Sequence, residues 1–499
     1  ESVVSKVLEL TGKLGVDATI ICAASKDDGP INLSAEITRE QGVVTALGLV
    51  NMNVPREAFY RKELSLVLSR SLGPGRYDPS YENHGLDYPA AYVRWTVGRN
   101  MASYLQLAAA GKIDPTRLIT HEFTFDQAIS AYDVITSDRD EFYCGVLLSY
   151  DFSARLKQQP IILKPSTHDG INGRLGIGVI GVGSYASKFL LPYLKRERLR
   201  FVLSGSGYNA YAAAKRFGFE EVAAKTEHVI DDPDTDVVLI ATRHNKHAEY
   251  AIQALNAGKA VFVEKPLCLS IEELQQIDSA HREGGFLHVG FNRRFSPAIS
   301  VVKDFFSSTG PLLFNCRVNA GPLLDHWLLD PIEGGGRILG EVCHFIDILR
   351  FLAGSPITRV YCSGLRKRGV DAISYEDVVI TLDFENCSTG TIVYTGSGSK
   401  ALSKERYEIF SGEKAAVIND FRTVELYKGK PRKVRIGKRD TGQSEQMKQF
   451  LAGVREGKPP IPYAELIEVS LATFAVIESL TRAMPVDMRE MWEVIGEHR

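Results

Sequence analysis

The chain has 499 residues, of which 44% are hydrophobic and 24% charged, so it is long enough for about two to four domains with hydrophobic cores. A formal net charge of −2 gives no electrostatic footprint for nucleic acid. Apolar runs such as Val237–Ala241 are too short to cross a bilayer. The sequence therefore predicts neither a nucleic-acid partner nor a membrane partner.

Seven cysteines are scattered without a CxxC pair, at positions 22, 144, 268, 316, 343, 362 and 387. Their odd number and wide spacing indicate reduced thiols in a cytoplasmic protein and argue against a structural zinc cluster, so we expect no metal. Residue 1 is a Glu within a helix-like stretch, and no charged-then-apolar leader precedes it. We therefore expect the sequence to be part of a longer protein.

The first block, residues 1–150, alternates short apolar strands with helices, and residues 151–173 form a polar, proline-containing stretch typical of a linker. The pattern predicts strands at Ala18–Ala23, Gly42–Leu47 and Leu64–Leu68, and a helix at Met101–Ala110.

The second block, residues 174–295, has the strand–helix spacing of βαβ units. Near-continuous apolar runs are typical of parallel strands that are buried on both faces. We predict strands at Gly176–Ile180, Phe201–Leu203, Val237–Ala241, Ala260–Val263 and Leu287–Gly290, and helices at Ala210–Phe217 and His247–Ala257.

The third block, residues 296–499, contains alternating segments separated by Gly and Asn turns, which predict antiparallel strands in an open sheet. These segments are Phe314–Asn319, Val378–Phe384, Thr389–Thr395 and Tyr407–Phe410. The predicted class is therefore α/β: a doubly wound parallel Rossmann sheet followed by an α+β domain with a large, mostly antiparallel open sheet.

A glycine-rich turn joins the first strand and helix of the second block. Gly181 permits a tight turn, Gly183 lets the backbone approach a pyrophosphate, and Ala186 lets the helix pack on the strand. Ser184 and Tyr185 lie at the helix N-terminus, whose free N–H groups bind phosphate. The turn follows a strand and begins a βαβ unit, so it predicts a dinucleotide site rather than a ligand-free turn.

The residue after the second strand distinguishes NAD from NADP. An acidic side chain there grips the ribose of NAD, but this chain has Ser204, with no acid and no directly following arginine. The sequence therefore leaves both NAD and NADP open.

Several further motifs occur in order along residues 174–499: Thr242 and His247 after the third strand, then Val263–Pro266, Gly290–Pro297 and Gly334–Asp347. Together with the glycine turn, they resemble the glucose–fructose oxidoreductase/inositol dehydrogenase (Gfo/Idh/MocA) family. The resemblance implies that Thr242, His247 and Glu264 bind the cofactor and that Lys265 faces the nicotinamide and a carbohydrate substrate. From the residues alone, a lysine after an apolar strand is equally a surface residue in a Glu–Lys ion pair.

His344 lies in a predicted helix from about Arg337 to Leu352, on a stripe apart from the apolar core positions. A lone helical histidine is usually packed or solvated, but the resemblance makes His344 the general base or acid for a sugar hydroxyl. The family commonly has an aspartate one turn earlier, where this chain has Gly340. We expect Glu341 to supply the carboxylate; the alternative is a simple helix-surface pair with Arg337.

The first block resembles the C-terminal part of medium-chain, zinc-type alcohol dehydrogenases. The resemblance rests on the stretches 9–20, 41–44, 73–79 and 121–132, and it implies a partial Rossmann block. The first glycine-rich turn and an identifiable set of zinc ligands are missing. We therefore expect this block to serve as structural support or as an assembly surface.

The resemblance implies an oxidoreductase that moves a hydride between NAD or NADP and a ring carbon of a sugar, sugar acid, cyclitol or nucleotide sugar. We also expect a homo-oligomer. Two alternatives remain: a glycosidase that uses transient oxidation by a retained NAD to drive elimination, and a non-catalytic NAD(P)-sensing regulator. Intact Lys265 and His344 argue against the regulator, and the absence of the aspartate argues for it.

Overall fold

The computed structural model describes residues 2–137, 141–150, 159–164, 173–281, 284–323, 326–365 and 371–496. The chain divides into two units, Glu1–Arg155 and Leu156–Arg499. The boundary lies within the stretch that we predicted to be a linker. Among the described residues, no helix is both long and apolar enough to span a membrane.

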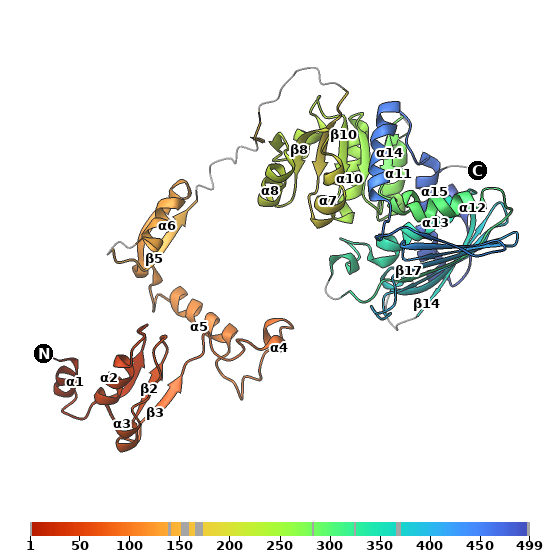
Figure 1. The fold of residues 1–499 in the computed structure, drawn as a ribbon. Helices are drawn as coiled ribbons and strands as arrows, with labels where there is room; N and C mark the ends of the chain where they lie inside the picture. The colour runs from red at the N-terminus through yellow and green to blue at the C-terminus, as the bar shows by residue number, and fades with distance from the viewer. Residues whose placement is uncertain are drawn as a thin grey trace. The chain divides into compact units, whose positions relative to one another are not determined.

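The N-terminal unit contains a three-stranded parallel sheet in the order β1-β2-β3, with a small core around Ile31 and Val44 (Figure 1). A second parallel pair joins β4 and β5. The elements are α1 (Val3–Leu10), β1 (Val16–Ile21), α2 (Gly29–Ile37), β2 (Thr38–Ala46), α3 (Arg56–Arg61), β3 (Ser65–Leu68), α4 (Pro79–Glu82), α5 (Val97–Ala109), η1 (Pro115–Leu118), β4 (Ile119–Thr124), η2 (Phe125–Gln127), α6 (Ala128–Thr136) and β5 (Gly145–Ser149). The predicted strands and helix of this block are confirmed, with their ends shifted by a few residues.

The C-terminal unit begins with a seven-stranded sheet in the order β12-β11-β10-β7-β8-β9-β6, whose strands are parallel except for β6. Its elements are β6 (Ile161–Ile162), β7 (Gly176–Ile180), α7 (Ser184–Phe189), η3 (Leu191–Tyr193), β8 (Arg198–Leu203), α8 (Gly207–Phe217), β9 (Glu221–Val222), α9 (Glu227–Ile230), β10 (Val237–Ile240), η4 (His244–Lys246), α10 (His247–Asn256), β11 (Ala260–Val263), α11 (Ile271–His281) and β12 (Leu287–Val289). The linker prediction is wrong for β6, because these residues pair with β9 at the sheet edge.

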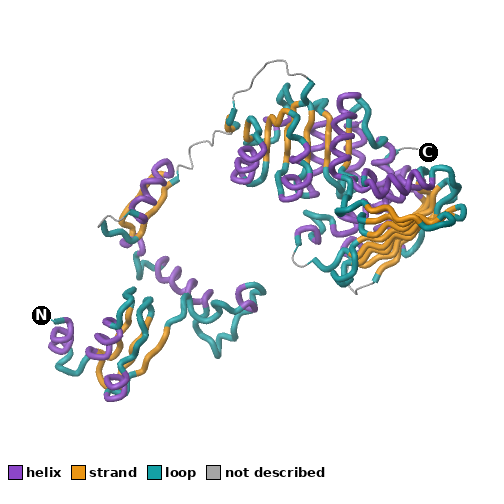
Figure 2. Tube along the Cα trace, viewed as in Figure 1, coloured by secondary structure: helices purple, strands orange, loops and turns teal. Residues whose placement is uncertain are grey.

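A nine-stranded sheet follows, in the order β20-β19-β18-β17-β13-β16-β15-β14-β21 (Figure 2). Its elements are η5 (Asn292–Phe295), α12 (Pro297–Phe306), β13 (Leu313–Asn319), η6 (Trp327–Leu329), η7 (Ile338–Val342), α13 (Cys343–Ala353), β14 (Ile357–Gly364), η8 (Ala372–Ser374), β15 (Asp377–Phe384), β16 (Thr389–Thr395), β17 (Glu405–Ser411), β18 (Lys414–Asn419), β19 (Thr423–Tyr427), β20 (Arg432–Arg435), α14 (Gln443–Glu456), α15 (Tyr463–Arg482), β21 (Val486–Asp487) and α16 (Met488–Val494). The sheet is mostly antiparallel as predicted, but β13 and β16 are parallel.

Two features tie the two sheets of the C-terminal unit together. Helices α13 and α15 contribute to the same core as residues of both sheets. Helix α14 lies far along the chain, yet it packs on the Rossmann sheet, where Phe450 contacts Phe262 edge to face at 5.2 Å. The predicted boundary at residue 295 therefore separates the two sheets but not their cores.

Candidate active site at the end of the Rossmann sheet

The glycine turn between β7 and α7 has the shape that a dinucleotide requires. Gly181 has a φ of 97°, and a Cβ there would lie 2.5 Å from the carbonyl oxygen of Ala241. A Cβ on Gly183 would meet nothing within 4 Å, so the space above the helix N-terminus is open. Ala186 is buried against the strands. The backbone can therefore approach a pyrophosphate here, and the residues fit the predicted cofactor.

The other predicted cofactor residues lie at the same edge of the sheet. Ser184 is the first residue of α7, and Tyr185 follows it with 36% of its surface exposed. Ser204 directly follows β8, as predicted. A cavity of about 690 Å³ runs from Gly183 and Ser184 along α7 and α8, and its lining includes neither Lys265 nor His344.

His247 joins the loops that follow β10 and β11. It is buried, and its Nδ1 and Nε2 lie 2.7 and 3.3 Å from the carbonyl oxygens of Pro266 and Thr242. Burial lowers its pKa to about 4, so the ring is neutral at pH 7. A neutral imidazole has one N–H, so the shorter contact, from Nδ1 to Pro266, is the hydrogen bond, and it anchors the loop that carries Lys265.

Glu264, the first residue after β11, has a buried carboxyl group with one unpaired oxygen. Its Oε1 has no hydrogen-bond partner among the described residues, and its Oε2 accepts a hydrogen bond of 3.3 Å from the backbone N–H of Lys265. Burial raises the pKa of Glu264 to about 7, although the charge of Lys265 opposes the rise. An unpaired polar atom in this place is available to a ligand.

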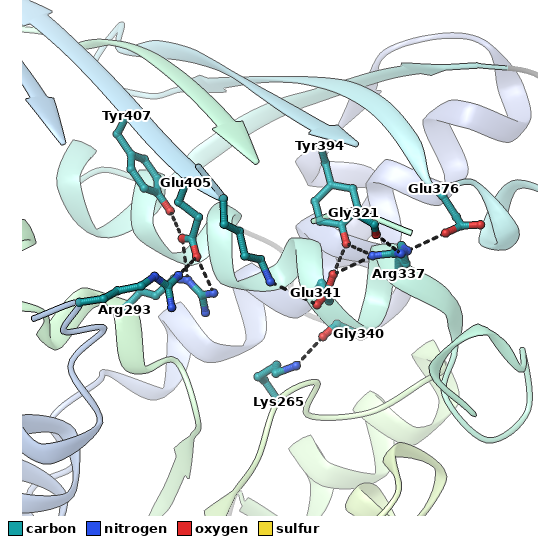
Figure 3. Close-up of polar contacts among 12 residues, drawn as sticks. Lys265, Arg293, Gly321, Arg337, Gly340, Glu341, Glu376, Tyr394, Glu405 and Tyr407 are labelled. Atoms are coloured by element: carbon teal, nitrogen blue, oxygen red, sulfur yellow. Dashed lines mark hydrogen bonds and ion pairs between the residues drawn. The ribbon is translucent and has the colours of Figure 1, made fainter. Parts of the chain in front are cut away.

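Lys265 reaches across to the helical segment that precedes α13. Its Nζ donates a hydrogen bond of 2.6 Å to the carbonyl oxygen of Gly340 (Figure 3). Gly340 belongs to η7, which is a π-helix rather than the start of one continuous α-helix as predicted. A π-helical turn of this kind often marks a functional site. Of the two readings of Lys265, the surface ion pair is wrong, because no carboxylate is its partner among the described residues.

His344 lies at the start of α13 and is only 6% exposed, so it does not face away from the core as the helix pattern suggested. Its Nδ1 has no hydrogen-bond partner in the described part of the chain. Burial, together with the charges of Arg293, Lys265 and Lys404, holds the pKa of His344 well below its ordinary value. The ring is therefore a neutral base next to Lys265.

Glu341 has more polar partners in the structure than the two predicted roles, a site carboxylate or a pair with Arg337, require. Its Oε2 accepts a short hydrogen bond from Tyr394 and lies 3.4 Å from Nη1 of Arg337, while its Oε1 lies 3.9 Å from Nζ of Lys404 (Figure 3). Burial opposes its ionisation, but Lys404 and Tyr394 hold its pKa below the ordinary value. Glu341 thus forms the predicted pair with Arg337 and also carries a charge into the site.

Gly340 itself leaves little room for the family's aspartate. A Cβ there would lie 2.4 Å from Cδ1 of Leu328 and 3.0 Å from Cε1 of His244. His244 is held by a 2.7 Å contact between its Nδ1 and the carbonyl oxygen of Gly334. A side chain at position 340 would therefore require its neighbours to move.

Two cationic residues of the site had no assigned role in the sequence analysis. Arg293 makes two hydrogen bonds of 3.0 Å to Glu405, which also accepts hydrogen bonds from Arg439 and Tyr407. Lys404 directly precedes Glu405 and points toward Glu341. Arg293 lay within a motif that the sequence analysis quoted, whereas no sequence pattern distinguished Lys404.

Comparison with known proteins gives two family matches. Residues 175–291 match the model described as an oxidoreductase family with an NAD-binding Rossmann fold, and residues 311–417 match the GFO/IDH/MocA C-terminal domain. Levoglucosan dehydrogenase of Pseudarthrobacter phenanthrenivorans is 29% identical over 297 residues, which cover 50% of this chain and 75% of that protein. The scyllo-inositol 2-dehydrogenase (NAD(+)) of Bacillus subtilis is 30% identical over 231 residues, or 44% and 65% of the two chains.

Solved structures agree with this match. Levoglucosan dehydrogenase in complex with NADH and L-sorbose superposes with a TM-score of 0.56 at 25% identity, over 63% of this chain and 98% of that one. A probable dehydrogenase from Thermotoga maritima gives a TM-score of 0.54 at 25% identity, over 63% and 100% of the two chains. The two domains of the C-terminal unit are therefore similar in sequence and fold to those of the GFO/IDH/MocA oxidoreductase family.

Proposed function

We propose that this chain is an NAD(P)-dependent oxidoreductase that transfers a hydride to or from a ring carbon of a sugar, sugar acid, cyclitol or nucleotide sugar. The observation that carries the proposal is the hydrogen bond from Lys265 to Gly340, one helical turn before buried His344, at the carboxyl end of the Rossmann sheet. Ligands bind in the crevice at this end of such sheets. The similarity to levoglucosan and inositol dehydrogenases supports a carbohydrate substrate.

The chain's own residues would bind the substrate and move its proton. The ammonium group of Lys265 uses one of its three N–H bonds on Gly340, which leaves two for the oxygen of the reacting hydroxyl. His344 would accept the hydroxyl proton during oxidation and return it during reduction, because its ring is neutral and has an unpaired Nδ1.

The cofactor would be held by the turn Gly181–Ala186 and by Ser204, Thr242 and Glu264. A nicotinamide dinucleotide supplies the acceptor or donor of the hydride when it is bound. The open space above Gly183 and the unpaired Oε1 of Glu264 support this placement. His247 contributes by anchoring Pro266, next to Lys265, through its Nδ1.

Purification of the chain, followed by mass spectrometry of the released cofactor, tests the proposal. We expect NAD(H) or NADP(H) to bind and its absorbance at 340 nm to change when a substrate sugar is added. A cofactor that stays bound while glycosidic bonds are cleaved would favour the elimination mechanism instead. Binding without any turnover across carbohydrate panels would favour the regulator.

We infer that the N-terminal unit corresponds to the C-terminal part of a medium-chain alcohol dehydrogenase and acts as structural support or as an assembly surface. The parallel sheet β1-β2-β3 supports the first inference, and exposed apolar side chains such as Leu10, Ile20 and Leu68 support the second. Mass measurement in solution with and without residues 1–155 tests the second part.

We also propose a cytoplasmic homo-oligomer. All seven cysteines are free thiols, which suits a reducing compartment. The outer face of the nine-stranded sheet carries partly exposed apolar side chains at Leu313, Phe410 and Tyr361, and Leu313 lies opposite Phe410 in the sheet. Light scattering of the purified chain would measure the assembly.

A further inference from the structure

The candidate active site is lined by cations that its carboxylates do not fully neutralise. Arg293 and Arg337 are each bound by a carboxylate at 3.0 Å or less, Glu405 and Glu376 respectively. Lys265, by contrast, binds a neutral carbonyl oxygen. Lys404 has Glu341 as its ion-pair partner at 3.9 Å, which is beyond hydrogen-bond distance.

The position of Lys404 is built into the fold rather than left to a free loop. Its carbonyl oxygen accepts a 2.7 Å hydrogen bond from the backbone N–H of Asn319. The buried side chain of Asn319 donates to the carbonyl oxygens of Ser399 and Leu402, at 2.7 and 3.1 Å. The following residue, Glu405, is anchored by Arg293. The backbone is thus held on both sides of Lys404, whose side chain is 39% exposed.

The charges that act on His344 agree with this picture. Beyond burial, the charges that shift the pKa of His344 are those of Arg293, Lys265 and Lys404, and no carboxylate in the described part of the chain raises it in opposition. Glu341 is the ion-pair partner of Lys404 among the described residues, but it is already engaged by Tyr394 and Arg337. An anionic group of a ligand would therefore enter a field that the protein leaves positive.

We propose that the substrate is a sugar with an anionic oxygen group, a carboxylate or a phosphate, and that Lys404 binds this group while Lys265 and His344 act on a ring hydroxyl. The inference rests on the proposed function and narrows its substrate class. Two N–H bonds of Lys404 can reach a carboxylate or phosphate without breaking its contact with Glu341. Neutral sugars and cyclitols would leave the Lys404 ammonium group in water, so Lys404 would add little to their binding free energy.

Matched sugars that differ at one carbon test the proposal. D-glucose, D-glucuronate and D-glucose 6-phosphate, with the corresponding galactose and mannose series, would be titrated into the cofactor-saturated chain. Binding is followed by calorimetry, and turnover is followed separately by absorbance at 340 nm. We expect at least one anionic sugar to bind about tenfold or more tightly than its neutral counterpart, and this preference to weaken as salt is added. Comparison of the affinities for the uronates and for the sugar phosphates shows which anion is bound.

Variants of Lys404 then assign the preference to a residue. Lys404→Gln should reduce affinity for the preferred anionic sugar by about tenfold or more, and reduce it far less for the neutral sugar. Lys404→Arg should restore most of the preference, and Lys428→Gln, at an exposed lysine between β19 and β20, should leave it intact. Equal losses for both sugars in Lys404→Gln, or no anionic preference in the unaltered chain, would overturn the proposal. Anion binding without redox turnover would leave the anion site standing and reject the dehydrogenase function instead.

Discussion

Lys265 donates its hydrogen bond to the backbone carbonyl oxygen of Gly340, not to a side chain. In the related family this part of the helix commonly carries an aspartate. Here a π-helical turn presents a carbonyl oxygen, and the nearest acidic residue along the chain, Glu341, turns toward Arg337, Tyr394 and Lys404. The ammonium group is therefore positioned by a backbone carbonyl oxygen rather than by a hydrogen bond to a carboxylate.

Replacing Lys265 with methionine should lower turnover by about 10²–10⁴ while cofactor affinity stays within about tenfold. Methionine keeps the apolar stem and loses the group that would polarise the reacting oxygen. Steady-state kinetics and cofactor titration measure the two effects. The control is Lys259→Met, at the opposite end of the same strand, where the lysine binds a backbone carbonyl oxygen and turnover should persist. Equal turnover in Lys265→Met and the unaltered chain would remove Lys265 from the mechanism.

Cofactor choice should change at Ser204, the first residue after β8. A carboxylate there would accept hydrogen bonds from the ribose hydroxyls and repel a 2′-phosphate, so Ser204→Asp should raise the NAD/NADP ratio of kcat/KM. Ser204→Asn is the matched uncharged control, and it should raise the ratio less. A ratio that does not rise for Ser204→Asp would show that Ser204 does not face the adenosine ribose.

The sequence predicted the Rossmann sheet well because its signals are local. The predicted bounds of β7 and β11 match those in the structure, as do those of β16 in the nine-stranded sheet, and each strand is a short run that a glycine or a charged residue ends. The glycine turn and Ser204 were likewise placed by their position relative to a strand.

The parts that the sequence did not predict depend on contacts between distant segments. Local hydrophobic periodicity does not indicate which distant segments pair. It therefore could not predict that β13 is parallel to β16 or that α14 packs on the Rossmann sheet. Lys404 enters the site because Asn319, some 85 residues earlier, holds its loop. His344 was predicted to lie outside the apolar stripe, but α13 is covered on all sides, so the histidine is buried.

The N-terminal unit should contain no catalytic zinc. A catalytic zinc site needs three protein ligands and an open position. No group of three His, Cys, Asp or Glu side chains able to hold a metal occurs among the described residues. We expect metal analysis of the purified chain to find less than stoichiometric zinc and simple alcohols to remain unoxidised. Stoichiometric zinc with alcohol oxidation that a chelator abolishes would contradict this.

Glu264 should make the stability of the ligand-free chain depend on pH. Burial raises its folded pKa to about 7, above the ordinary 4.5, so between these values the folded state holds a proton that the unfolded state has lost. Stability contributed by this group therefore falls as pH rises from about 4.5 to about 7. The glutamine in Glu264→Gln cannot ionise. The unfolding free energy of the variant minus that of the unaltered chain should therefore be about 1–3 kcal/mol larger at pH 8 than at pH 5. Urea denaturation at both pH values measures this.

The exposed Glu456 at the end of α14 provides the control for that comparison. Glu456→Gln should change the free energy of unfolding similarly at pH 5 and pH 8. A Glu264→Gln chain with the same pH profile as the unaltered chain would show that the carboxyl group is ionised in the folded state.

Placing the family's aspartate at position 340 should destabilise the chain. The new Cβ would lie 2.4 Å from Leu328 and 3.0 Å from His244, and His244 is held by Gly334. We expect Gly340→Asp to lower the free energy of unfolding by about 1–3 kcal/mol, because overpacking forces neighbouring side chains and backbone to shift.

Glu341→Gln tests whether Glu341 acts on the substrate site through its charge or only supports Arg337 and Tyr394. If its charge acts on the substrate site through Lys404, kcat/KM should fall by about tenfold or more, and Gly340→Asp in that background should restore none of the loss. Glu376→Gln is the matched control, because it removes the closer carboxylate partner of Arg337 but leaves the carboxylate of Glu341. It shows how much stability is lost when Arg337 loses a partner. The comparison of kcat/KM with the unfolding midpoint across these variants decides between the roles. A Glu341→Gln chain that loses stability like Glu376→Gln but keeps its kcat/KM would confine Glu341 to holding Arg337 and Tyr394 in place.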